Sequence, residues 1–413
     1  MNIWLVTIGE PLPSQSGIKK LRTALLADRH IGRNHQVVLF VSAFDHLKKK
    51  WIFTDDATVK ISECYYLQVL KGKGYKKNVS LSRFIDHRII AKKFRQRAPL
   101  QAKPDMIVVS MPPHDLAYEV VKYATKNQIP VLVDIRDPWP DVFLQSFPRA
   151  MAKLIRFVLF NEFNYVKNAL KLADGLVATS STLLDWGLNY AGRKVSEKDH
   201  VFYLGQNKSL DVSDADMSVL LKEKSEILKD QFIVFFFGTF AHYHSPMVLI
   251  DSAKKLIDNT QIHFMIAGDG ELMPELKKQS ENLQNVTLTG WLDQNEMNFW
   301  LRKSKVGACP TPKRVDILPN KAGTYLSAGL PIVSSFQGDL KTIIEKEQIG
   351  FYYSPNNADA LSENILKLFN DKILYQRMSE NAKKVFSDLF DAEQVYNEYV
   401  NHIESVFNNY KSK

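Results

Sequence analysis

The sequence alternates short apolar strands with helical segments, and this alternation begins a second time near the middle of the chain. In the first run, apolar stretches are separated by segments whose apolar residues have helical spacing. We expect strands at Ile3–Ile8, Gln36–Val41, Met106–Val109, Val131–Asp134 and Gly175–Thr179, and a helix at Ile18–Ala27. Strand–helix–strand units of this kind form parallel, doubly wound sheets. The first half therefore predicts one α/β domain.

The second run predicts another domain of the same class. Its expected strands are Phe232–Phe237, Ile262–Ala267, Val286–Thr289, Val306–Cys309 and Pro331–Ser334. A chain of 413 residues with 45% apolar content is long enough for two such cores. We therefore predict an α/β fold of two Rossmann-like, doubly wound domains.

The charged stretch 195–228 separates the two runs and is interpreted as the interdomain connection, with a hinge near Gly205. We expect an N-terminal acceptor domain at 1–205 and a nucleotide-sugar domain at 206–390. The segment 391–413 is expected to be a helix that packs across the domain junction, because apolar residues recur at helical spacing in it. These residues are Val395, Tyr399, Ile403 and Val406.

The cysteines and the apolar stretches indicate the compartment in which the protein is expected and whether it is expected to cross a membrane. The two cysteines, Cys64 and Cys309, lack the spacing of a zinc site or a disulfide framework, which favours a reducing, cytoplasmic compartment. The N-terminus reads as a strand rather than a signal peptide. The apolar stretch Leu154–Phe163 is interrupted by charges well before the roughly 18 residues that a membrane span needs, so no crossing is expected.

Positive charge is concentrated in the first half. Residues 1–205 contain 31 Lys and Arg against 18 Asp and Glu, whereas the remainder contains 23 against 27. Such a surplus is typical of a domain that meets a membrane surface, a phosphate-linked acceptor or nucleic acid, and also of a merely solvated basic surface. Nucleic acid is disfavoured, because no reading helix or aromatic platform is recognisable.

Glycines follow several expected strands, where loops of this fold class bind ligands. Gly9 and Gly17 follow the first strand of the first half, and Gly238 and Thr239 the first strand of the second. The Gly268–Gly270 turn is typical of a phosphate loop or of a tight capped turn, and the turn is favoured. The backbone of Gly290 and Leu292 is a candidate for contact with a nucleobase edge.

Segment 316–333 is the most informative one, with the layout loop, helix, turn and strand. Pro319 can open the helix, where its missing N–H costs nothing. Asn320 and Lys321 then place donors at the positive end of the helix dipole, which would stabilise a diphosphate. Gly329 and Pro331 are explained by helix termination and strand initiation alone.

The segment Asp134–Asp141 places Asp134, Arg136 and Asp137 at the end of a buried strand in the first half. Active sites of doubly wound sheets lie at such strand ends. An Asp–Arg pair is also a common structural salt bridge, so both interpretations stay open. Two prolines and Trp139 would stiffen this loop.

Taken in order, these motifs resemble the glycosyltransferases of the two-domain GT-B fold. They resemble in particular the large retaining family four and its bacterial surface-polysaccharide members. The resemblance covers nearly the whole chain. It depends on the segments KNVSLSRFIDH, PDMIVVSMPPH, VDIRDPWPD and KLADGLVATS, and further along on IAGDGEL, VTLTGWLDQNEM, PNKAGTYLSAGLPIVSS and GFYYSPNNADALSENILKLFND.

The resemblance implies a donor site in an interdomain cleft. Relatives carry two glutamates eight positions apart, near the transferred sugar and the nucleotide ribose, where this chain has Asp316 and Thr324. Relatives also carry an Arg and a Lys after the first strand of the second domain. Here His242, His244 or Lys321 would take over that role, and Lys321 is preferred.

The resemblance further implies transfer from a nucleotide diphosphate sugar, with retention and without a metal or other cofactor. Asp137, Asp316 and Lys321 are the expected catalytic residues, and His114, Arg136 and Asp137 the expected acceptor contacts. The expected donor contacts are Gly9, Gly17, Gly238, Thr239, Gly290, Leu292, Pro319, Asn320, Lys321 and Thr324.

The expected acceptor is a glycan or a lipid-linked oligosaccharide used for surface polysaccharide, lipopolysaccharide or capsule. The basic and apolar stretch 149–160 suits peripheral contact with an anionic membrane, and equally a helix packed on the sheet. Two other functions stay open. Because Asp316 and Thr324 stand in place of the family glutamates, one is a non-catalytic sugar-nucleotide-binding partner of another transferase. The other is an epimerase of nucleotide sugars on the same fold.

Overall fold

The computed structural model describes residues 1–13, 20–78, 80–144, 147–208, 228, 230–241, 244 and 246–412. The chain divides into two compact units. The first comprises Met1–Tyr203 and Val395–Lys413, and the second comprises Leu204–Gln394.

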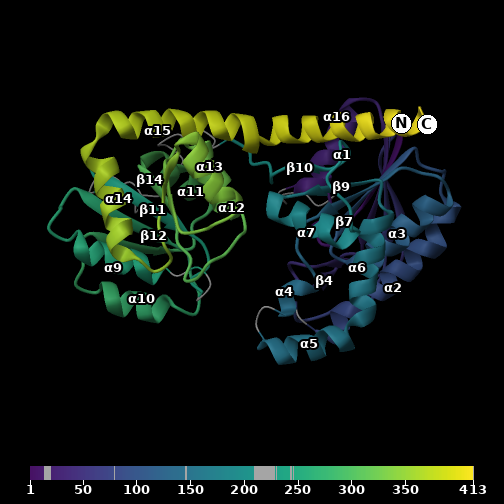
Figure 1. Ribbon diagram of the computed structural model, residues 1–413, viewed down its shortest axis with the longest axis horizontal. Helices are drawn as coiled ribbons and strands as arrows, with labels where there is room; N and C mark the ends of the chain where they lie inside the picture. The colour runs from purple at the N-terminus through teal and green to yellow at the C-terminus, as the bar shows by residue number, and fades with distance from the viewer. Residues whose placement is uncertain are drawn as a thin grey trace. The chain divides into compact units, whose positions relative to one another are not determined.

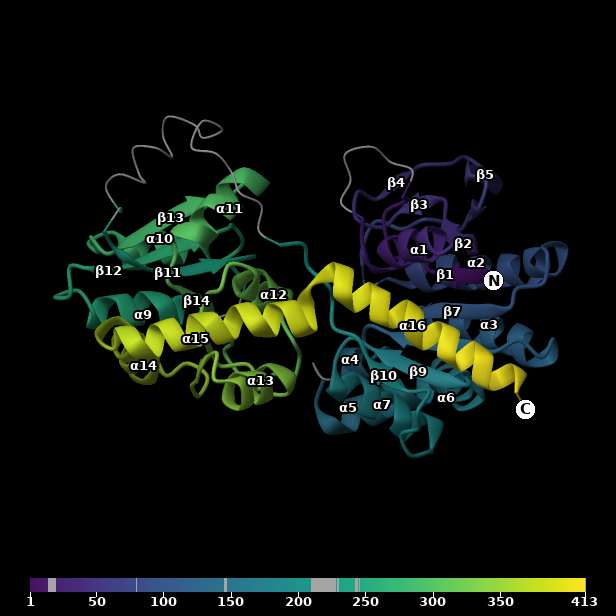
Figure 2. The same cartoon turned by 90° about the horizontal axis from the view of Figure 1, so that it is seen from above.

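The first domain is built on an eight-stranded sheet with the order β10-β9-β8-β7-β1-β2-β6-β5, in which only β5 is antiparallel to its neighbour. A small antiparallel pair, β3–β4, is separate from it. Figure 2 shows this pair and β5 on the β2 side of the domain. The strands are β1 Asn2–Val6, β2 Gln36–Ser42, β3 Phe44–Asp45, β4 Lys50–Trp51, β5 Ala57–Ser62, β6 Tyr65–Leu70, β7 Met106–Met111, β8 Val131–Ile135, β9 Gly175–Ala178 and β10 His200–Val201.

Helices cover both faces of this sheet. One buried cluster joins alternate residues of β1, β7, β8 and β9 to α2, α3, α6 and α7. The opposite face is covered by α1 and the later turns of α16 (Figure 1). The helices of the domain are α1 Arg22–Gly32, α2 Leu81–Arg97, α3 His114–Lys126, α4 Asp141–Leu144, α5 Arg149–Val158, α6 Phe160–Leu172 and α7 Ser181–Ala191, with a 3₁₀ turn at Ala98–Leu100; α16 is Ala392–Lys411.

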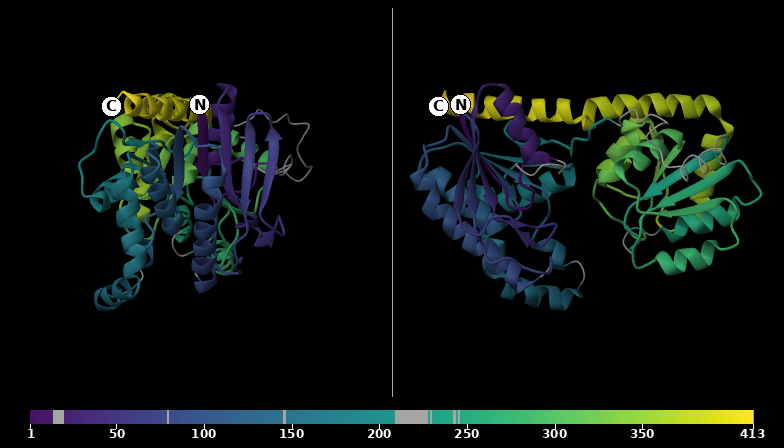
Figure 3. Two further views of the ribbon diagram at one scale, coloured as in Figure 1. Left: turned by 90° about the vertical axis from the view of Figure 1, so that its right-hand side faces the viewer. Right: turned by 180° about the vertical axis from the view of Figure 1, so that it is seen from behind.

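The second domain contains a six-stranded sheet, all parallel, with the order β13-β12-β11-β14-β15-β16. Its strands lie between two helical layers (Figure 3). The strands are β11 Phe232–Phe237, β12 Ile262–Ala267, β13 Val286–Gly290, β14 Val306–Cys309, β15 Ile332–Ser334 and β16 Gly350–Tyr352. The helices are α9 Met247–Lys255, α10 Met273–Ser280, α11 Gln294–Lys303, α12 Asn320–Ser327, α13 Asp339–Glu347, α14 Ala358–Asn370 and α15 Lys372–Val385, followed by a π turn at Phe386–Phe390.

Two Rossmann-like domains therefore make up the chain, which confirms the predicted fold class. The central strands are nearly continuous apolar runs because helices bury both of their faces. The structure corrects both ends of the helix expected at Ile18–Ala27, because Lys20 and Leu21 are not helical and α1 begins at Arg22. The helix expected to end at Ala27 continues to Gly32, because His30 is buried on the same helix face as Leu26.

Candidate functional site

The loops after β11 and β12 interlock at the carboxyl edge of the second sheet. Phe240 N donates to the Asp269 carbonyl oxygen at 2.9 Å. A Cβ on Gly268 would lie only 1.9 Å from the Gly238 carbonyl oxygen, so this close approach requires glycine. Gly268 N in turn donates to the Gly290 carbonyl oxygen at 2.7 Å. These glycines therefore let the loops after β11, β12 and β13 pack closely against one another. This packing agrees with the interpretation of Gly268–Gly270 as a tight turn.

Lys321 reaches this edge from the first turn of α12, whose N-cap is Pro319. Its side chain is buried, with 8% of the residue exposed. The space left by the missing side chain of Gly238 lies beside Lys321 Nζ, 3.1 Å from the position a Cβ would take. The ring of Phe236 lies 4.1 Å from the same atom. The structure thus brings together two of the predicted donor residues, Gly238 and Lys321.

No hydrogen-bond partner for Lys321 Nζ occurs among the described residues. Burial lowers the pKa of this ammonium to about 8, and the neighbouring Cys309 opposes the shift. A buried cation without a counter-ion is unfavourable unless an anion compensates it. Among the described side chains of the second domain, this lysine is therefore a candidate for binding an anion.

The other donor-side predictions lie around the same edge, with different exposure. Asn320 is exposed beside Lys321, and Thr324 is half-buried one turn further along α12. Asp316 precedes the helix and forms an ion pair with Arg314 at 3.5 Å. Thr239 is exposed, whereas Leu292 is half-buried and Gly290 has open space where a Cβ would point. Of the two histidines named as substitutes, His242 lies outside the described residues.

His244 is close enough to Lys321 for their charges to interact. Burial and, to a smaller extent, the positive charge of Lys321 together lower the pKa of His244 to about 4. At neutral pH this histidine is therefore uncharged, and Lys321 is the cation of the pair.

In the first domain, Arg136 is engaged by its own protein. It donates to Asp134 Oδ2 at 3.0 Å and to Thr23 Oγ1 at 2.7 Å, and it forms an ion pair with Glu10. Arg22 binds both oxygens of Asp134, with contacts of 2.9 Å to Oδ2 and 3.0 Å to Oδ1. This geometry matches the structural salt-bridge interpretation of the Asp134–Arg136 pair. The contacts of Arg22 and Glu10 were not predictable from sequence, because these residues are more than 100 positions from their partners Asp134 and Arg136 in the chain.

His114 opens α3 and is buried, and its Nε2 lies 2.6 Å from Glu162 Oε2. Since a carboxylate only accepts, Nε2 carries the proton in this pair. Arg88 forms an ion pair with the same carboxylate. Burial alone would raise the pKa of Glu162, but the hydrogen bonds from His114 and Arg88 bring it below its ordinary value. Glu162 was missed in the sequence because it lies on α6, 48 residues from His114 in the chain.

Asp137 follows β8 and keeps an exposed face. The surrounding protein desolvates its carboxyl enough to raise the pKa, while the positive charges of Arg83 and Arg136 pull it down. Gly9 is exposed at the end of the β1 loop, and Gly17 lies outside the described residues. The predicted acceptor residues therefore include one exposed carboxylate, Asp137, and two side chains, His114 and Arg136, that are bonded within the domain.

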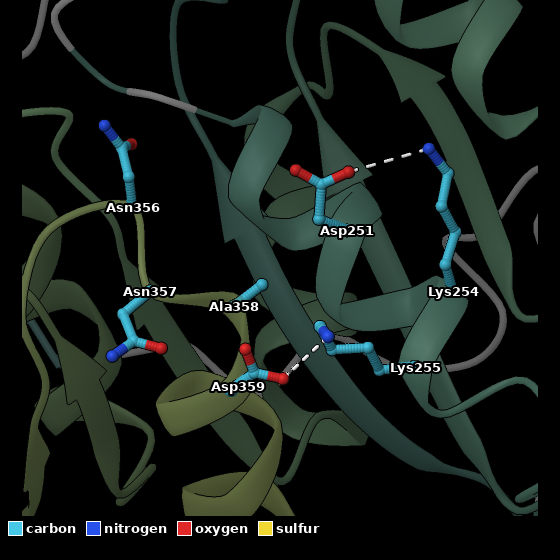
Figure 4. A pocket seen from close by; sticks show the side chains of 7 residues that line it. All are labelled: Asp251, Lys254, Lys255, Asn356, Asn357, Ala358 and Asp359. Carbon is cyan, nitrogen blue, oxygen red and sulfur yellow. Dashed lines mark ion pairs between the residues drawn. The ribbon is translucent and has the colours of Figure 1, made fainter.

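A shallow hollow of about 590 Å³ lies between α9 and the start of α14 (Figure 4). Its charges are paired with one another: Lys255 Nζ lies 2.6 Å from Asp359, and Lys254 Nζ lies 3.5 Å from Asp251. This pairing leaves the hollow without the uncompensated charge that marks the Lys321 region.

Two further properties concern the described parts of the chain. No group of three or more His, Cys, Asp or Glu side chains there is placed to hold a metal ion. None of the helices there combines the length and apolar character needed to cross a bilayer.

The fold is that of the GT-B proteins. The chain is similar to HepE of Anabaena, crystallised with UDP, with a TM-score of 0.67 and 16% identity over 98% of this chain and 99% of that one. It is also similar to a sucrose-phosphate synthase from Thermosynechococcus elongatus, with a TM-score of 0.72 and 15% identity over 99% of each chain. Residues 220–385 match the family model described as glycosyl transferases group 1.

Curated relatives bear the names of glycosyltransferases. O-antigen chain mannosyltransferase C of Escherichia coli is 26% identical over 43% of this chain and 47% of that protein. The UDP-Gal:alpha-D-GlcNAc-diphosphoundecaprenol alpha-1,3-galactosyltransferase of Escherichia coli is 31% identical over 40% of this chain and 43% of that protein. The chain thus spans about half the length of the curated relatives it matches.

Proposed function

We propose that this protein is a glycosyltransferase that moves a sugar from a nucleotide diphosphate sugar onto a glycan or lipid-linked acceptor. The observation that carries the proposal is the buried ammonium of Lys321, which has no partner among the described residues and lies beside Gly238 at the carboxyl edge of the second sheet. Ligands of doubly wound sheets bind at this edge. The match of residues 220–385 to group 1 glycosyl transferases supports the same activity.

In this proposal the second domain holds the donor. The leaving nucleoside diphosphate gains negative charge as the anomeric bond breaks. Lys321 and the free N–H groups of the first turn of α12 stabilise that charge. Gly238 leaves room for a phosphate to approach the lysine. Asp316 contacts the donor sugar, and Gly290 and Leu292 contact the base.

The first domain holds the acceptor near Asp137 and His114. The acceptor hydroxyl attacks from the face that the nucleotide leaves, and the departing phosphate accepts its proton, which gives retention of configuration. Glu162 fixes the orientation of the His114 ring through the 2.6 Å hydrogen bond. Arg136 orders the loop that carries Asp137 rather than contacting the acceptor, because its donors already bind Glu10, Thr23 and Asp134.

A panel of nucleotides tests the donor proposal. Thermal unfolding is measured with uridine, guanosine, adenosine and cytidine diphosphates and with their sugar conjugates. We expect one nucleotide series to raise the melting temperature selectively, because a ligand that binds only the folded state stabilises it. An absence of any shift across the panel would contradict donor binding.

We further propose that α5 and the start of α6 rest on the cytoplasmic face of an anionic membrane during surface polysaccharide synthesis. None of the described side chains of α5 is buried, so the helix is not packed into the core. Leu154, Phe157 and Phe160 are 62%, 79% and 61% exposed, and Lys153 lies exposed among them. An apolar face with flanking cations is typical of helices that lie in a membrane interface.

Flotation with vesicles checks this surface. We expect the protein to float at low salt with vesicles that contain phosphatidylglycerol, and the double variant Leu154→Ser/Phe157→Ser to lose at least about tenfold in partitioning because two buried apolar contacts disappear. Ile373→Ser is the matched control, since Ile373 is 80% exposed on the other domain. Equal flotation of the double variant and the control would contradict the proposal.

One observation favours a second function. Thr324 occupies a position on α12 where relatives carry a carboxylate for the ribose, so a non-catalytic nucleotide-sugar-binding protein is the alternative. Selective nucleotide binding without release of nucleoside diphosphate, in the presence of varied acceptors, would favour this alternative. Conversion of the donor sugar without an acceptor would instead indicate an epimerase.

A further inference from the structure

Two cations, two aromatic rings and one histidine from separate parts of the first domain meet in one cluster. We call it the Arg83 cluster, and it consists of Arg83, Lys49, His46, Tyr75 and Trp139. Lys49 follows β3, Tyr75 lies in the loop before α2, Arg83 is in the first turn of α2, and Trp139 lies in the loop after β8. Its members are far apart in the sequence, and the fold brings them together.

The rings hold the two cations in place. The Arg83 guanidinium lies 4.4 Å from the Trp139 ring centre and 5.4 Å from that of Tyr75. Lys49 Nζ lies 4.8 Å from the same Tyr75 ring. Tyr75 is itself fixed by His46, whose Nδ1 lies 2.6 Å from the tyrosine oxygen. Cations stacked on aromatic faces are ordered without being neutralised.

No carboxylate in the described parts of the chain lies within ion-pair distance of Arg83 or Lys49. Two of the nearby acids bind backbone groups, and the third, Asp137, acts on Arg83 only from beyond ion-pair distance. Asp86 accepts from Gly74 N at 2.7 Å, and Asp45 accepts from two backbone N–H groups of its own turn. The polar contacts of the cations are neutral: Arg83 donates to the Asn78 carbonyl oxygen at 2.9 Å, and Lys49 donates to the Asn78 side chain.

His46 and His87 are uncharged at neutral pH, so they do not alter the positive charge of the cluster. Burial lowers the pKa of His46 to about 4, with Arg83 and Lys49 adding to the shift, and burial lowers the pKa of His87 as well. Burial also lowers the pKa of Lys49, and the positive charge of Arg83 lowers it further. Two like charges are therefore held side by side, an arrangement that an anion between them would stabilise.

The cluster adjoins the predicted acceptor loop. Trp139, on which Arg83 stacks, lies two residues beyond Asp137 on the same loop, and the charges of Arg83 and Asp137 interact. Exposed Lys73, Lys76 and Lys77 precede Arg83 in the chain and add positive potential around the cluster. An acceptor whose hydroxyl lies at Asp137 would thus carry its anionic group toward Arg83.

We propose that Arg83 and Lys49 bind a phosphate or diphosphate group of the acceptor, so that the acceptor is a phosphate-linked sugar rather than a neutral glycan. This inference rests on the proposed transferase function and names the acceptor class. Arg83 offers a planar pair of donors for phosphate oxygens, and Lys49 supplies a second charge.

Calorimetry with inorganic pyrophosphate tests the site. The titration is made at low salt in the Lys321→Met background, so that the proposed donor site cannot contribute. We expect binding in that background, and an affinity at least about tenfold weaker when Arg83→Gln and Lys49→Gln are added, because two charge-assisted contacts are lost. Arg95→Gln with Lys50→Gln is the matched control, since it removes the same charge from exposed positions.

The outcomes separate the possible sources of the anion. Unchanged pyrophosphate affinity in the Arg83→Gln/Lys49→Gln variant overturns the proposal. So does a result in which pyrophosphate does not bind but flotation with phosphatidylglycerol vesicles depends on these two residues, because the ligand is then a membrane headgroup. Arg83→Lys should retain part of the affinity, and unchanged melting temperatures exclude loss of folding as the cause.

The two proposals also fail separately. The Arg83→Gln/Lys49→Gln variant in the wild-type Lys321 background should bind nucleoside diphosphate normally, since that site lies in the other domain. Normal nucleotide binding with no pyrophosphate site in the first domain overturns the acceptor inference alone. Loss of nucleotide selectivity across the panel with a retained pyrophosphate site overturns the proposed donor function.

Discussion

Replacing Lys321 by methionine is expected to abolish most of the activity and at the same time to stabilise the fold. The side chain is 8% exposed, and its ammonium has no hydrogen-bond partner among the described residues. Loss of one preorganised charge at the leaving group should lower kcat/KM by about 100- to 1,000-fold. Removing a buried, uncompensated charge should raise the free energy of unfolding by about 1–2 kcal/mol. Turnover of the nucleotide sugar and denaturant unfolding measure the two effects.

A loss of activity together with a gain in stability distinguishes a lysine that acts in catalysis from one that supports the fold. If the lysine merely supported the fold, its replacement would lower both the activity and the stability of the protein. Lys341→Met is the control, because Lys341 is exposed and lies 3.7 Å from Glu345 in a surface ion pair. We expect this control to change either quantity little. A Lys321→Met variant that is less stable than the wild type would show that the lysine has a structural partner.

The stability gain of Lys321→Met should depend on pH. Burial lowers the folded-state pKa of Lys321 to about 8, below the unfolded value of 10.5. Between these values the unfolded chain binds more protons, so the stability of the wild type rises with pH across this interval. The methionine variant lacks this titration. Its advantage should therefore be largest below pH 8 and should shrink toward pH 10.5, which denaturant unfolding at several pH values can measure.

The sequence predicted the central strands well because they are buried on both faces. Phe232–Phe237 is apolar throughout and Ile262–Ala267 is apolar except for His263, so no amphipathic pattern competes with the strand interpretation. The edge of the first sheet was missed. β5 carries Thr58 and Lys60 on a mostly exposed strand, so it lacks the apolar run on which the prediction depended. β6 does contain such an apolar run, so this strand could have been predicted from the sequence.

The candidate site was predictable where its residues are close in sequence. Pro319, Asn320 and Lys321 form one segment, and their place at the start of α12 follows from helix-capping rules. Contacts between distant segments were not predictable. No periodicity indicates that Gly238 leaves space for Lys321, or that Glu162 bonds to His114. Such pairs depend on strand order and helix packing, which a single sequence does not contain.

The Asp134–Arg22 pair shows how a catalytic-looking motif can be structural. Both side chains are 2% exposed, and Arg22 grips the carboxylate of Asp134 with two nitrogens, at 2.9 and 3.0 Å. Arg22 also donates to the Phe202 carbonyl oxygen at 2.9 Å and lies 5.0 Å from the Tyr399 ring centre. The pair therefore connects α1 and β8 to Phe202, which directly follows β10, and to Tyr399 on α16.

Replacing Asp134 by asparagine should cost about 3–5 kcal/mol of stability, because Arg22 is left buried without its counter-ion. Burial alone would raise the pKa of Asp134, but Arg22 and Arg136 bring it below 3.8. This stabilisation is present above the unfolded pKa of 3.8 and is lost as pH falls through the lower folded value. Arg33→Met is the control, because the Arg33–Glu404 pair is 31% and 30% exposed and should contribute less than about 1 kcal/mol. If thermal unfolding showed equal losses for the two variants, the buried pair would contribute no more than a surface contact.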